Sequence, residues 1–188
     1  MIEFDYGRYY WKNELIELRL ATKDDWELHH NNYYDTQSRF YLDGMLELPP
    51  NKELCKDEWN KLITQHNRHM FIILDNDGLA VGCANINSMD ERNGTFSTGV
   101  IIYDGEHGKG YATSALTILA NYAFKERRFN KWNSGYIKGN DASEAMHDKL
   151  GFTIEGIIRE SIFHNGTFWD EVLCGMTVEE FMDKYSLN

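Results

Sequence analysis

Short runs of alternating or continuous apolar residues predict most of the strands in this chain of 188 residues. Residues 15–20 alternate between apolar and charged positions from Ile16 onward, and residues 69–74, 79–87 and 95–103 are apolar runs of strand length. The turn sequences Asp75-Asn76-Asp77-Gly78 and Glu91-Arg92-Asn93-Gly94 separate the last three runs and favour an antiparallel meander. Further strands are predicted at 131–137, 152–163 and 167–177, and His164-Asn165-Gly166 is a hairpin turn between the last two.

Helical spacing of apolar residues predicts a long helix at about 109–128 and a short one at 141–150, closed by Gly151. Thr22 and Asp25 resemble a capping box that opens a helix to about residue 34, and Asn51 is positioned to cap another. The order of elements indicates a mixed α/β (α+β) fold with one central, mostly antiparallel sheet flanked by helices.

The length and composition are those of one folded domain. Its two prolines, Pro49 and Pro50, sit in a loop between helices, so we expect a single domain over residues 1–188, with an aromatic N-terminal extension at 1–14 and a core at about 15–178. The extension either packs on a partner, as in a homodimer, or adds to its own sheet. Mean hydropathy is −0.56, and the chain shows neither a signal peptide nor a membrane span, which predicts a cytoplasmic protein.

Charge and cysteine content narrow the function. The formal net charge of −11 disfavours nucleic-acid binding and is compatible with a cationic amine substrate, although acidic surfaces also serve solubility. The three cysteines are far apart, and there is no zinc-type spacing of Cys and His, so we expect reduced thiols and no metal.

A strand, a glycine-rich turn and a helix start follow one another at residues 100–113. Successive backbone N–H groups, the positive end of the helix and Lys109 together favour an anion site such as one for pyrophosphate. The P-loop pattern fails because Gly110, and not Ser or Thr, follows Lys109, and the dinucleotide-binding pattern fails at Thr113. The alternative is that these glycines only shape the turn.

The sequence here resembles the GNAT superfamily of N-acetyltransferases. His107, Gly110 and Ala112 occupy the fixed positions of its R/Q-x-x-G-x-G/A motif, with His replacing the usual Arg or Gln. Residues 140–152 resemble a second family block, N-x-x-S-x-x-x-Y-x-K-L-G-F, with His147 at the Tyr position. The predicted strand at 15–20, followed by Thr22 to Asp25, resembles the family's opening LRxxTxxD, so the resemblance spans about residues 15–178 and is nearest to the ribosomal-protein alanine N-acetyltransferases.

The resemblance implies a direct transfer of the acetyl group from acetyl-CoA, as co-substrate, to a primary amine of a small molecule or a protein N-terminus. One strand would splay from its neighbour and bond the pantetheine arm, here through Val100, Ile101 and Ile102, which are otherwise plain core residues. The pyrophosphate would lie on backbone amides beside His107, from these residues: Gly108, Lys109, Gly110, Tyr111, Ala112 and Thr113.

The resemblance also implies roles for Asn140, Ser143 and His147, which share one helix face. The Asn would contact pantetheine, and Ser143 or His147 would be the general acid that protonates the departing thiolate. The competing interpretations are an N-cap for Asn140, a solvated serine and a buried spacer. Ser97 stands where relatives carry a Glu base, and Asp90 and Glu91 fit a turn better than a base.

The acceptor is open: a peptide N-terminus, a polyamine, an aminoglycoside or an amino sugar all fit. Its pocket is expected near an aromatic group that is otherwise core: Tyr33, Tyr34, Phe40, Tyr41 and Trp169. The alternative function is a non-catalytic acyl-CoA-binding sensor or regulatory module, suggested by the departures at His107, Ser97 and His147.

Overall fold

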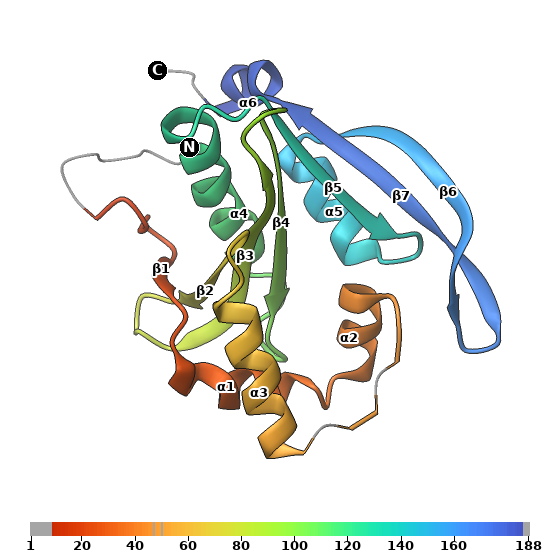
Figure 1. Cartoon of the computed structure of the whole chain (residues 1–188). Helices are drawn as coiled ribbons and strands as arrows, with labels where there is room; N and C mark the ends of the chain where they lie inside the picture. Colours follow the sequence, from red (N-terminus) through yellow and green to blue (C-terminus); the bar gives the residue numbers. More distant parts are fainter. Residues whose placement is uncertain (1–8, 47, 50, 186–188) are drawn as a thin grey trace.

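One seven-stranded sheet runs through the centre of the molecule, with the strand order β1-β2-β3-β4-β5-β7-β6 (Figure 1). The structure is a computed structural model and describes residues 9–46, 48–49 and 51–185. All neighbouring strands pair antiparallel except β4 and β5, which are parallel. The strands are β1 Glu17–Leu20, β2 Arg68–Leu74, β3 Ala80–Asp90, β4 Thr95–Ile102, β5 Lys131–Ile137, β6 Thr153–His164 and β7 Thr167–Thr177.

Helices cover both faces of this sheet. The helical segments are η1 Lys23–Asp25, α1 Trp26–Asn32, α2 Thr36–Asp43, α3 Lys52–Ile63, α4 Tyr111–Asn121, η2 Tyr122–Glu126, α5 Asp141–Leu150 and α6 Val178–Tyr185. Alternation along β2 divides its side chains between the two faces. Phe71 and Ile73 belong to the large core with α4, whereas Met70 and Ile72 pack with Trp59 of α3.

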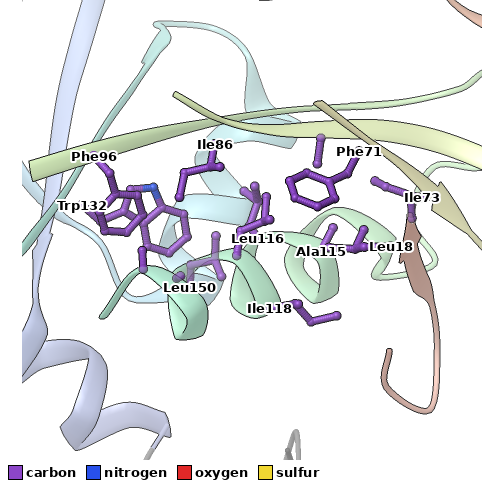
Figure 2. Close-up of a cluster of buried hydrophobic side chains, with 14 of the residues drawn as sticks. Leu18, Phe71, Ile73, Ile86, Phe96, Ala115, Leu116, Ile118, Trp132 and Leu150 are labelled. Atoms are coloured by element: carbon purple, nitrogen blue, oxygen red, sulfur yellow. The ribbon is translucent and has the colours of Figure 1, made fainter. Parts of the chain in front are cut away.

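The large core lies between the sheet and α4, as Figure 2 shows. Phe96 and Trp132 stand at one end of it, and Leu18, Phe71 and Ile73 at the other. The described part of the N-terminal extension joins this core, because Trp11 stacks on Phe71 at 5.3 Å between ring centroids. Phe4 and Tyr6 of the extension lie outside the described residues.

The predicted mixed α/β fold with one mostly antiparallel sheet is confirmed. The meander of β2, β3 and β4 lies where the pattern placed it. The long helix starts two residues later than predicted, because Gly110 precedes α4 in the left-handed conformation (φ 86°), and after Asn121 it continues as the π-helical η2. The helix predicted from Thr22 is shorter and begins as the 3-10 segment η1.

Candidate active site

β4 and β5 diverge after a very short contact. They pair only at Thr95–Lys131, Phe96–Trp132 and Ser97–Asn133, whereas β4 stays paired to β3 as far as Ile102 and β5 stays paired to β7 as far as Ile137. The facing backbone edges of residues 98–102 and 134–137 therefore have no strand partner (Figure 1). Such edges offer N–H and C=O groups to an extended ligand.

The diverging strands β4 and β5 form a V. One phenyl and one indole ring stack on each other and close its narrow end, which we call the vertex. The rings of Phe96 and Trp132 are fully buried and lie 5.8 Å apart at 15°. Trp132 Nε1 donates a 3.0 Å hydrogen bond to Thr98 Oγ1, on the first β4 residue beyond the contact, and Phe152 packs edge-on against the indole. The vertex is thus fixed by packing and by one partly buried hydrogen bond.

The predicted splayed segment, Val100 to Ile102, contributes both to the core and to the unpaired edge. Val100 and Ile102 pack against the α4 core, and Ile101 packs with the cluster on the opposite face. Their side chains are therefore core while their outer backbone edge is unpaired, so the two interpretations of this triplet are compatible.

The loop that leaves β4 presents a row of free backbone N–H groups. Tyr103 N donates to Val81 O and Glu106 N donates to Tyr103 O, which anchors the start of the loop. Gly105, Gly108 and Gly110 take left-handed conformations. Among the described residues, no protein acceptor is found for the N–H groups of residues 108–113, and the first helical bond is from Ser114 N to Gly110 O. This arrangement, at the N-terminus of an eleven-residue helix, suits an anion.

The charge of Lys109 in this loop is offset by its neighbour Glu106, and Asp104 adds a further negative charge. Lys109 Nζ lies 2.8 Å from Glu106 Oε2, and this hydrogen bond raises the pKa of Lys109. His107 is exposed. The attraction for an anion therefore comes mainly from the backbone amides.

On α5, Asn140 acts as the helix cap. Its Oδ1 accepts from Ser143 N at 3.1 Å, which is the cap interpretation raised from the spacing. Ser143 is half-buried, and its Oγ lies 3.3 Å from His147 Nδ1. The structure thus brings Asn140, Ser143 and His147 together in one hydrogen-bonded group beneath β5.

His147 is buried, and both of its ring nitrogens are engaged. Nδ1 lies 2.7 Å from the carbonyl oxygen of Ser143, and Nε2 lies 2.8 Å from Ser134 Oγ of β5. A carbonyl oxygen only accepts, so we assign the proton to Nδ1, and Nε2 then accepts from the Ser134 hydroxyl. Burial lowers the pKa of His147, which agrees with a neutral ring.

A cavity of about 500 Å³ lies on the other side of β4, between the sheet and the first three helices. It reaches residues 98–101 at the splayed edge, and Asn85 and Asn87 of β3 form part of its floor. Gly99 leaves room for Asn85, since a Cβ there would lie 2.7 Å from Asn85 Nδ2. The cavity therefore opens onto the same stretch of β4 that borders the V.

The aromatic residues expected near the acceptor lie in different surroundings in the structure. Tyr33 lines the cavity, whereas Tyr34 is 74% exposed. Phe40 stacks on His164 at 3.7 Å and lies 5.7 Å from Trp169, which ties α2 to the β6–β7 hairpin. The sequence did not predict the polar residues of the cavity floor, Asn85 and Asn87. Their signal was that they alternate with apolar residues within a strand that is otherwise apolar.

The expected turn residues lie away from this cavity. Asp90 Oδ1 accepts from the backbone N–H groups of Arg92 and Asn93, and Glu91 pairs with Arg127 at 2.7 Å. Cys83 lines the cavity, but burial raises the pKa of its thiol to about 12, so it is protonated at neutral pH. Cys83 is therefore not an activated nucleophile.

The described ranges hold no group of three His, Cys, Asp or Glu residues placed to bind a metal ion. Every helix in those ranges is too short or too polar to cross a lipid bilayer.

His29 in the cavity wall should make the protein sensitive to acid. Burial, with the nearby Arg39 guanidinium, lowers the pKa of His29 to about 4. The unfolded chain therefore binds more protons between about pH 6.5 and pH 4, and stability falls as the pH falls through that window. We expect the wild type to lose about 2 kcal/mol more than His29→Gln between pH 7 and pH 5, by urea unfolding. The exposed His66→Gln is the control, and equal losses for wild type and His29→Gln would contradict this.

Comparison with known proteins places these features in context. The model of the acetyltransferase (GNAT) domain matches residues 16–153. The chain is 30% identical to the SPbeta prophage-derived uncharacterized N-acetyltransferase YokL of Bacillus subtilis (strain 168), over 92% of this chain and 95% of that protein. It is 26% identical to a second protein of that organism, named "Putative ribosomal N-acetyltransferase YdaF", over 90% and 94% of the two chains.

A solved structure has the same fold. The spermidine N-acetyltransferase of Vibrio cholerae, in complex with CoA and spermine, superposes with a TM-score of 0.79 over 89% of this chain and 98% of that chain. The two sequences are 20% identical, so the likeness concerns the architecture.

Proposed function

The chain belongs to the GNAT family of acetyltransferases, and on that premise we propose which of its residues bind acetyl-CoA and move the proton. The protein is an acetyl-CoA-dependent N-acetyltransferase that acts on an amine. We propose direct transfer to a primary amine, of a small molecule or a protein N-terminus, without an acyl-enzyme.

The observation that carries the proposal is the continuity of the V with the free amides of the loop. The unpaired edge of Val100, Ile101 and Ile102 ends at the loop whose N–H groups, on residues 108–113, donate to no protein acceptor among the described residues. An extended amide-containing arm suits the first, and a pyrophosphate suits the second. Both parts fit one molecule of acetyl-CoA, whose thioester would supply the acetyl group.

Proton transfer is assigned to Ser143. The neutral amine attacks the thioester carbonyl and the C–S bond breaks; the attacking nitrogen gives one proton to solvent water, and the departing sulfur takes one. His147 has its Nδ1 proton bonded to a carbonyl oxygen and its Nε2 lone pair engaged by Ser134, so it acts as a positioning residue. Ser143 is half-buried, and water on its open side would replace the proton that it gives.

The experiment that tests this function is release of free CoA thiol from acetyl-CoA by the purified protein with a panel of primary amines. We expect thiol release that depends on both the protein and the amine, with one acetylated amine formed per thiol. Binding of acetyl-CoA without release of thiol with any amine would favour the non-catalytic acyl-CoA-binding module instead.

The pair of Lys109 and Glu106 should tune the affinity for acetyl-CoA. Glu106→Gln frees the Lys109 ammonium for the phosphates of acetyl-CoA. We expect a two- to fivefold lower Kd, which corresponds roughly to the free energy of an exposed ion pair. Lys109→Met should raise Kd by a similar factor, and both effects should shrink in salt. Isothermal titration at low and physiological ionic strength checks this.

Glu179→Gln is the matched control, because it removes the same charge from α6, at the closed end of the V (Figure 1). If Glu179→Gln tightened binding as much as Glu106→Gln, the net charge of −11 would be the cause, and not the local pair.

A further inference from the structure

The cavity on the acceptor side carries cations that the protein does not neutralise. Asp43 pairs with Arg39, and Glu58, whose Oε2 accepts from Tyr33 Oη at 2.7 Å, keeps its negative charge, so the three cations of the wall exceed its two carboxylates by one. Lys61 and Arg68, also in the wall, have no carboxylate partner within 4.0 Å among the described residues. The overall acidity of the chain is thus reversed locally in this cavity.

The Arg68 side chain has an unsatisfied hydrogen-bond donor among the described residues. Its Nε is buried and makes no hydrogen bond within the described ranges. A buried donor without an acceptor costs free energy, and a guanidinium meets a carboxylate or phosphate with two parallel hydrogen bonds. Lys61 lies on α3 and Gln65 just after it, so both add donors beside the start of β2.

The register of the sheet gives the distance from this group to the chemistry. Arg68 of β2 faces Asn87 of β3, and Asn87 faces Ser97 of β4 at the vertex. Two strand spacings of about 4.8 Å put the Arg68 backbone about 10 Å from β4, and its side chain lies in the cavity between them. An amine at the splayed edge would therefore have room for an anionic group a few bonds away.

We propose that the acceptor is a primary amine that also bears an oxyanion, a carboxylate or a phosphate, held by Arg68 and Lys61. This rests on the proposed function, because it names the class of amine that enters the same site. The acidic surface of the protein attracts the ammonium end of the acceptor, and the cations of the cavity bind its oxyanion end. A polyamine has no group for these two cations.

Matched pairs of acceptors test the proposal. We expect kcat/KM to be at least tenfold higher for γ-aminobutyrate than for butylamine, or for O-phosphoethanolamine than for ethanolamine. The first pair identifies a carboxylate and the second a phosphate as the group selected. Preference for butylamine, ethanolamine or spermidine over both oxyanion-bearing acceptors would overturn the proposal.

Variants separate specificity from general damage. Arg68→Gln should raise KM about tenfold or more for the preferred oxyanion acceptor, leave kcat near the wild-type value and leave the neutral amine unaffected. Lys61→Gln, at an exposed position on α3, should act in the same direction and serves if Arg68→Gln folds poorly. Arg92→Gln, exposed in the β3–β4 turn, is the control. Equal loss for neutral and oxyanion acceptors in both cavity variants would contradict the assignment.

A binding measurement keeps this result distinct from failure of the proposed function. N-acetyl-γ-aminobutyrate and its amide differ only at one end, a carboxylate in the first and a neutral carboxamide in the second, and calorimetry needs no turnover. The wild type should bind the acid at least tenfold more tightly than the amide, and Arg68→Gln should lose the difference. Equal binding of acid and amide, together with no preference for O-phosphoethanolamine over ethanolamine, overturns the proposal even if amines are acetylated, whereas the expected difference supports it even if no thiol is released.

Discussion

Replacing Ser143 with Ala is expected to lower kcat about 100-fold at saturating acetyl-CoA and acceptor, the usual contribution of a positioned proton donor. The variant should bind acetyl-CoA with an unchanged Kd, because the Ser143 backbone N–H that Asn140 caps is retained. Steady-state release of thiol gives kcat, and calorimetry gives Kd.

The role of His147 is separated from that of Ser143 by the pH profile. If His147 were the acid, kcat would fall as the pH rises through its pKa, which burial places below the ordinary value of about 6.5. With Ser143 as donor, no such fall occurs between pH 6.5 and pH 8, and His147→Gln reduces kcat about tenfold by loosening Ser143. Wild-type rates from Ser143→Ala, His147→Gln and the double variant would remove both residues from the mechanism.

Replacing Trp132 with Ala is expected to destabilise the fold by about 3–5 kcal/mol, as for other buried aromatic residues. The indole is fully buried between the Phe96 ring and the edge of Phe152, so its removal leaves a cavity at the vertex. Urea unfolding of wild type and variant, without ligand, measures the difference.

Two milder variants divide this loss into packing and hydrogen bonding. Trp132→Phe keeps most of the packing and loses the bond to Thr98, and Thr98→Val removes the same bond from the other side, so each should cost about 1 kcal/mol. A cost below 1 kcal/mol for Trp132→Ala would show that the vertex does not depend on this ring.

The parts of the fold that sequence predicted are those governed by local rules. The strands of the meander follow alternation and turn residues, and the start of α4 follows the glycines of the loop. The helix α6 was not predicted, although Val178, Phe181, Met182 and Tyr185 follow helical spacing and pack on the α4 core, because the predicted core ended at about residue 178.

The candidate site was predictable where its residues are neighbours in the chain. Asn140, Ser143 and His147 share a helix face by spacing alone. Ser134, whose hydroxyl bonds to His147 Nε2, lies on a different element, and only the packing of α5 on β5 brings them together. The place of Arg68 in the cavity depends on the register of β2 against β3, because a one-residue slip would turn its side chain to the other face of the sheet.

The short contact between β4 and β5 also has a mechanical meaning. It is the backbone link between the half of the sheet formed by β1–β4 and the half formed by β5–β7. Five residues of β4 extend beyond it, a lever of about 16 Å at 3.3 Å per residue. A rotation of about 5° at the vertex would therefore change the width of the far end by about 1.4 Å, which is enough to make or break hydrogen bonds to a bound arm. Residues at the vertex can thus set the width of a site that they do not touch.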